Sequence, residues 1–167
     1  MYLEFQLRRV VLFAGLAVLS TQTAMAAKPE IRLAPPIFAQ QLVDQTVEHQ
    51  KGILDLIFHV TPPQEKQNYA IAAFTEKERG AKSGADDLDV ATTGQPVVEV
   101  QKDGVRIGVL LPLKDRQGAT IGTLGIVYTY KAGQAEQPFL RRSQSIRDTL
   151  ARQIPAREAL FVRAAQR

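Results

Sequence analysis

Three consecutive apolar segments separated by very short turns constrain the fold of this chain more than any other feature. The segments are residues 97–101, 105–113 and 119–130, and the turns between them are residues 102–104 and 115–118. Both turns contain the aspartate and glycine that tight antiparallel hairpins need for positive φ angles. Apolar residues alternate along the middle segment, so one face of the sheet is apolar and has to be covered. The sequence therefore predicts an antiparallel meander with helices packed on one face.

The cover is predicted on the N-terminal side of the meander. From Pro36 to Val60 an amphipathic pattern of helical period runs without an interrupting proline, which predicts one long helix ended by Pro62-Pro63. The acidic side chains opposite its apolar face alternate with Lys51, which is typical of a solvated surface. Residues 69–75 then predict a buried strand, and residues 86–90 a single helical turn.

The C-terminal part is predicted to be helical and basic. Residues 138–154 place apolar side chains at helical spacing, Pro155 interrupts, and the pattern resumes over residues 156–165. Residues 131–167 carry eight basic and three acidic side chains, whereas the whole chain has a net charge of +4. We predict an α+β fold class, with a long N-terminal helix packed on a curved antiparallel sheet and C-terminal helices.

Glycines interrupt the predicted sheet at Gly108, Gly122 and Gly125. Glycine weakens a strand unless the strand bends or another group approaches its backbone closely, so a curved sheet with a concave side is expected. Such curvature permits a ligand cavity, but it equally allows a small sheet to wrap around a helix with no ligand.

The first residues have the pattern of an export signal. Arg8 and Arg9 precede an apolar run from Val10 to Leu19, and the small-x-small sequence Ala24-Met25-Ala26 follows. The run is about half of the ~20 residues that span a bilayer. We therefore expect a signal peptide over residues 1–26, cleaved after Ala26, and a periplasmic location. General secretion is favoured over twin-arginine export, although the paired arginines leave both routes open.

Composition excludes several kinds of chemistry. The chain has no cysteine, so a disulfide scaffold, a thiolate metal site and a cysteine nucleophile are excluded. The phosphate-binding glycine motifs are absent, and no cofactor is expected. His49 and His59 lie on the predicted helix about 15 Å apart along its axis, too far to share a metal ion. The length fits one domain, predicted over residues 27–154, with a helical tail over residues 155–167.

The order of the predicted elements over residues 36–130 is distinctive, together with four stretches: Ser83–Asp89, Thr93–Pro96, Gly108–Leu113 and Asp115–Gly125. In these features the sequence resembles the extracytoplasmic Cache branch of the PAS-like fold. Cache domains bind small organic molecules between the sheet and the loop that contains the short helix. They usually form the sensing half of a kinase or chemoreceptor, whereas this sequence resembles a free-standing single module without an output domain.

The resemblance implies a periplasmic ligand-binding module that reports occupancy to a separate membrane protein. By analogy, the ligand-binding residues are Tyr69, Arg79, Ser83, Asp86 and Tyr128. Arg79 would fork onto a carboxylate of the ligand, and Ser83 would donate a hydrogen bond. Surface charge for Arg79 and core packing for the two tyrosines remain the plainer interpretations.

Two other classes of function are open at this stage. The chain could be an envelope interaction protein that binds another protein through its basic C-terminal helices, with Leu160 and Phe161 at the contact. An enzyme is the weakest hypothesis, because the serines lie in no Gly-x-Ser-x-Gly context and only two histidines could serve them. We therefore expect no catalytic residues.

Overall fold

The predicted meander forms one side of a five-stranded antiparallel sheet with the strand order β2-β1-β5-β4-β3. The computed structural model describes residues 36–164. The strands are β1 (Ile53–Val60), β2 (Tyr69–Ala73), β3 (Val97–Val100), β4 (Arg106–Lys114) and β5 (Thr120–Thr129). The helices are α1 (Phe38–His49), α2 (Ala85–Thr93), α3 (Gln137–Gln153) and the 3₁₀ turns η1 (Glu76–Glu78) and η2 (Arg157–Phe161).

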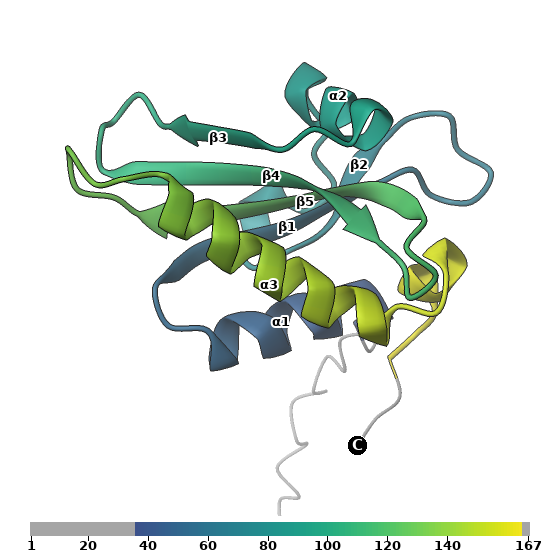
Figure 1. Ribbon diagram of the computed structural model, residues 1–167. Helices are drawn as coiled ribbons and strands as arrows, with labels where there is room; N and C mark the ends of the chain where they lie inside the picture. Colours follow the sequence, from purple (N-terminus) through teal and green to yellow (C-terminus); the bar gives the residue numbers. More distant parts are fainter. Residues whose placement is uncertain (1–35, 165–167) are drawn as a thin grey trace, which may run out of the picture. The chain divides into compact units, whose positions relative to one another are not determined.

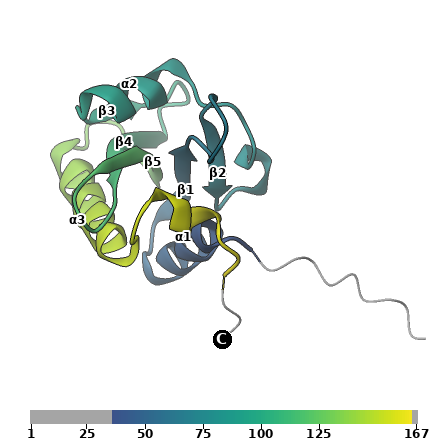
Figure 2. The same ribbon diagram turned by 90° about the vertical axis from the view of Figure 1, so that its right-hand side faces the viewer.

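The helices cover the two faces of the sheet unequally. Helices α1 and α3 lie side by side on one face, while α2 lies on the other (Figures 1 and 2). The core fills the space under α1 and α3, where Leu42 and Leu150 pack with Phe58, Leu111 and Leu124 from the three central strands. Because side chains alternate along a strand, the residues between these project toward α2. The predicted α+β fold class is confirmed.

The long helix predicted from Pro36 to Val60 is wrong in its second half. Helix α1 ends at His49, Gly52 adopts a positive φ of 82°, and the chain continues as strand β1. Glycine is the residue that most readily takes this left-handed conformation after a helix. Strand β1 then pairs with β2 on one side and β5 on the other. Long-range pairing of an apolar, β-branched segment outweighs a weak helical periodicity, so His59 lies on a strand and not at a helix end.

The C-terminal segment packs on the body of the fold. Helix α3 matches the predicted range closely, but the second predicted helix is only the 3₁₀ turn η2. Leu160 is 0% exposed, and the main chain of Val162 accepts a hydrogen bond from the amide of Phe38 at the start of α1. The interpretation of Leu160 as a contact residue for another protein is therefore wrong, because the side chain is part of the core. Phe161 is only partly buried and also packs against that core.

The predicted leader over residues 1–26 lies outside the described residues. Among residues 36–164, every helix is too short or too polar to cross a membrane.

Candidate functional site

A hollow of about 240 Å³ lies on the face of the sheet that carries α2. Its apolar walls are Ile57, Val97, Leu110 and Val127, which the alternation along four strands brings to this face. Gly108 and Gly125 contribute no side chains. A Cβ atom at Gly108 would find its nearest neighbour 3.7 Å away, and one at Gly125 would find it 3.4 Å away. Both are ordinary van der Waals distances, and the main chain of these two glycines lines the hollow without a side chain entering it.

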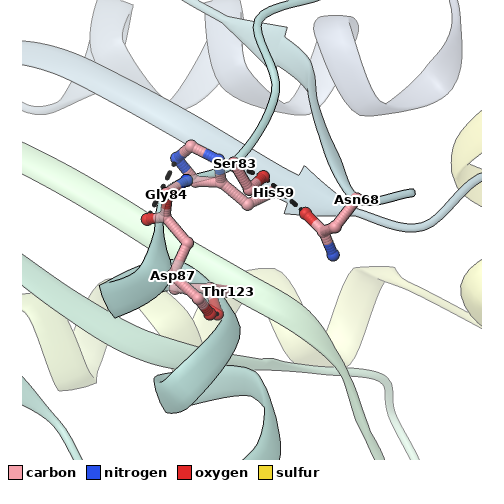
Figure 3. Close-up of polar contacts among 6 residues, drawn as sticks. All are labelled: His59, Asn68, Ser83, Gly84, Asp87 and Thr123. Carbon is pink, nitrogen blue, oxygen red and sulfur yellow. Dashed lines mark hydrogen bonds and ion pairs between the residues drawn. The ribbon is translucent and has the colours of Figure 1, made fainter.

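The polar wall of the hollow consists of His59, Asp87, Glu99 and Gln101. Two of these residues, His59 and Asp87, also belong to a polar cluster with Ser83 and Asn68 (Figure 3). His59 on β1 stands at its centre, with Nδ1 2.9 Å from the Oγ atom of Ser83. Ser83 Oγ donates to Oδ1 of Asn68 at 2.6 Å. On the other side of the ring, Nε2 lies 3.5 Å from Oδ1 of Asp87. The side chains of His59 and Asp87 are only 13% and 15% exposed.

The hydrogen bonds fix where the proton of neutral His59 resides. The Oδ1 atom of Asn68 can only accept, so the single hydroxyl proton of Ser83 is directed at Asn68. Ser83 Oγ then accepts from His59, which places the imidazole proton on Nδ1. The Nε2 atom of the neutral ring is left as an acceptor that lines the hollow beside Asp87.

Asp87 is held in place by two hydrogen bonds. Its Oδ2 atom accepts from the amide of Gly84 at 2.8 Å, in the capping position at the start of α2. Its main-chain oxygen accepts from the hydroxyl of Thr123 on β5 at 2.6 Å. These contacts join α2 to the sheet and leave Oδ1 directed at the His59 ring. The carboxylate is thereby positioned before any ligand arrives.

The environment of His59 favours its neutral form. Burial lowers the pKa of this imidazole below its ordinary value of 6.5, although Asp87 and, more weakly, Glu78 and Asp55 act in the opposite direction. The free-energy cost of burying a cationic ring here exceeds the electrostatic stabilisation that the nearby carboxylates provide. At neutral pH the hollow therefore contains an uncharged imidazole and a carboxylate.

Lowering the pH is expected to destabilise the protein through His59. The unfolded chain binds this proton at its ordinary pKa and the folded chain only at a lower pKa, so the unfolded state holds more protons as pH falls. The free energy of unfolding should thus decrease as the pH falls through the ordinary imidazole pKa of 6.5. His59→Gln, which does not titrate, should flatten this part of the curve in urea unfolding measured across that pKa. An identical slope in the variant would contradict this account of His59.

Serine, histidine and aspartate also form the triad of many hydrolases, but the proton positions differ here. A nucleophilic serine gives its proton to the histidine, whereas the hydroxyl proton of Ser83 is directed at Asn68. The histidine nitrogen beside Ser83 already carries a proton and cannot serve as its base in this arrangement. The cluster is instead suited to hold the ring of His59 in one orientation. Within the described residues, no group of three or more histidine, aspartate or glutamate side chains could hold a metal ion.

The structure does not bring the five residues suggested by the resemblance into one hollow. Ser83 contacts His59, and Asp86 is exposed on the first turn of α2. Tyr69 lies at the start of the edge strand β2, and Arg79 donates to the main-chain oxygen of Ala73 at 2.8 Å. The hypothesis that Arg79 forks onto a ligand carboxylate therefore has no geometric support.

Tyr128 lies on the opposite face of the sheet. Its side chain is 1% exposed, its hydroxyl is 2.8 Å from Ser143 on α3, and its ring centroid is 5.5 Å from that of Phe139. The guanidinium carbon of Arg142 lies 5.2 Å from the same ring centroid. Tyr128 thus belongs to the core beneath α3, in agreement with the core-packing interpretation of this tyrosine.

Sequence reasoning missed His59, Asn68 and Asp87 as members of the site. A signal for His59 was present, because Leu56, Phe58 and Val60 alternate with Ile57 and His59 in the manner of a strand. Asn68 gave no signal, since its partner Ser83 is fifteen positions away and is separated from it by strand β2 and the turn η1.

Two solved structures resemble this fold. One is described as a GAF sensor protein from Burkholderia vietnamiensis, with 12% identity, a TM-score of 0.50, and coverage of 72% of this chain and 76% of that chain. The other is a double mutant of the PobR transcription factor inducer binding domain from Acinetobacter, in complex with 3-hydroxy benzoic acid. Its identity is 11% and its TM-score 0.42, with 70% of this chain and 97% of that chain covered.

The comparisons define a fold class. No family model matches the sequence, and no curated protein matches it. The likeness to the first structure shows that the chain has the GAF/PAS-like α+β fold. In this fold the described hollow lies between α2 and the sheet, on the face away from the main core.

Proposed function

We propose that this chain is a small-molecule-binding, sensor-like module whose ligand occupies the hollow between α2 and the sheet. The observation that carries the proposal is a hollow with apolar walls, two glycines whose main chain lines it, and a polar wall in which His59 and Asp87 are held in place by hydrogen bonds. Ligand sites generally combine apolar lining with a few fixed polar groups. The likeness to a GAF sensor supports the same class of function by analogy of fold.

The finer assignment rests on the sequence. The stretches that resemble Cache domains support membership of that branch, and residues 8–26 support export to the periplasm through a cleaved leader. In that setting the module would report ligand occupancy to a separate membrane protein. We propose no enzymatic activity, and the orientation of the Ser83 hydroxyl supports this part of the proposal.

Gly108→Val is expected to abolish ligand binding without harming the fold. The new side chain would extend into the hollow, and its Cβ atom would meet its nearest neighbours at ordinary contact distances of 3.7 and 3.9 Å. Because glycine weakens a strand interior, the free energy of unfolding should rise by about 0.5–1 kcal/mol. The measurement is a thermal-shift screen of organic acids, amino acids, purines and amines against both proteins.

The matched control is Thr129→Val, which places valine at an exposed position of β5 that does not line the hollow. A class of compound that raises the melting temperature of the wild type and of Thr129→Val, but not of Gly108→Val, supports the proposal. Failure of every class to shift the wild type would refute it, as would equal shifts in all three proteins.

A further inference from the structure

The polar wall of the hollow carries two acids and no cation, and the amide of Gln101 is its neutral donor. Asp87 and Glu99 are the charged side chains that line it, and its described lining includes neither lysine nor arginine. The adjoining groove contains two cations, but each is paired with its own acid: Lys77 with Glu78, and Arg106 with Asp103. The electrostatic character of the hollow is therefore acidic.

The pair formed by His59 and Asp87 is incomplete as a hydrogen-bonded unit. In the neutral ring Nε2 is an acceptor, and Oδ1 of the carboxylate 3.5 Å away is an acceptor too. Neither atom can donate to the other. A group that offers at least two donors and sits between them would satisfy both at once.

We infer that the hollow binds a small molecule through a protonated amine, held between Asp87 Oδ1 and His59 Nε2, with the apolar body of the ligand on the sheet. This inference rests on the function proposed above and specifies its ligand class. An ammonium group has three donors and a positive charge that complements Asp87, whereas a hydroxyl has one donor. A carboxylate would be repelled by both Asp87 and Glu99.

The dimensions of the hollow limit the ligand. About 240 Å³ corresponds to roughly eight water volumes at about 30 Å³ each. Ile57, Leu110 and Val127 provide an apolar surface beside the polar wall. A compact hydrocarbon group of six or seven carbons that carries one amine has suitable size and polarity.

Protonation of His59 opposes this mode of binding. A cationic ring would lose its free acceptor and would repel the ammonium group. The charged groups that face the ring are Asp87 on α2, Glu78 in η1 and Asp55 on β1, and Glu99 on β3 also lines the hollow. All four are acids, so His59 is the group among them whose protonation adds a positive charge to the site. Affinity for an amine should therefore fall as the pH is lowered through the pKa of His59.

The test uses three compact amines: benzylamine, hexylamine and cyclohexylmethylamine. Each is titrated calorimetrically at about pH 7.5 and about pH 5.5, beside the alcohol and carboxylate of the same skeleton. At least one amine should bind the full chain, its alcohol roughly tenfold more weakly, and its carboxylate not measurably. Binding of a carboxylate in preference to its amine would overturn the inference and leave the proposed function standing. Binding of no compound of any class would refute both.

Variants assign the binding to the inferred atoms. Asp87→Asn keeps an oxygen for the amide of Gly84 but removes the charge, and should weaken amine binding roughly tenfold or more. His59→Gln keeps an acceptor near the Nε2 position, so it should retain affinity within about threefold while losing the pH dependence. His59→Asn keeps a donor for Ser83 but no acceptor toward the hollow, and should bind weakly.

A second variant tests the inference if Asp87→Asn does not fold. Glu99→Gln removes a charge from an exposed strand position that lines the same hollow, and should weaken amine binding severalfold while leaving alcohol binding unchanged. Equal amine affinities in wild type, Glu99→Gln and His59→Asn would overturn the inference.

Discussion

Leu160→Ala is expected to lower the free energy of unfolding by about 2–5 kcal/mol, the range for a leucine removed from a packed core. Leu160 is 0% exposed and belongs to the cluster that α1 and α3 form on the sheet. It lies in η2, which follows helix α3 in the chain. The C-terminal turn therefore closes one end of the core, and urea unfolding followed by circular dichroism measures its contribution.

Val162→Ala is the matched control for this prediction. Val162 lies two positions away and is 62% exposed, so its truncation should change the free energy of unfolding by less than about 0.5 kcal/mol. Its main-chain oxygen, which accepts from the amide of Phe38, is unaffected by the substitution. Equal and small effects of both substitutions would mean that residues 157–161 are not part of the folded core.

The behaviour of the C-terminal segment changes the interpretation of its basic charge. A protein-binding surface built on Leu160 would need that side chain at the surface, and the structure places it in the core. Two of the arginines have structural contacts: Arg142 donates to the main-chain oxygen of Lys51 and lies over the ring of Tyr128, and Arg147 pairs with Asp148. Their positions account for part of the charge without any external partner.

The meander was predictable because its signal is local. The turns at residues 102–104 and 115–118 determine that β3, β4 and β5 are antiparallel neighbours, as the structure shows. Strand β1 was not predictable by the same means. It pairs with β5, which lies some seventy positions further along the chain. The apolar periodicity on the two sides of Gly52 is also compatible with one continuous helix.

The candidate site was predictable only in outline. The glycine pattern predicted a curved sheet and left a ligand cavity open as one interpretation. Gly108 and Gly125 do line the hollow, and Ser83 contacts His59 beside it. His59 reaches the hollow only because it lies on strand β1. The sequence predicted a helix over this segment, so His59 was not considered as a site residue. Tyr128 was placed on the wrong face relative to the hollow because alternation gives relative faces but not which face carries α2.

Gly122→Ala is expected to lower the free energy of unfolding by about 2–3 kcal/mol, although it adds a single methyl group. A Cβ atom at this position would overlap the main-chain oxygen of His59 and lie 2.9 Å from Cγ2 of Val60. Relief requires β5 to move away from β1, which would shift His59 relative to Thr123 and hence to Asp87. Gly108→Ala provides the contrast, since its Cβ meets only ordinary contacts and should raise stability by about 0.5–1 kcal/mol. Chemical unfolding should thus show changes in the free energy of unfolding that have opposite signs for the two variants. Two changes of the same sign would mean that the close approach of β1 and β5 at Gly122 does not hold His59 and Thr123 in register.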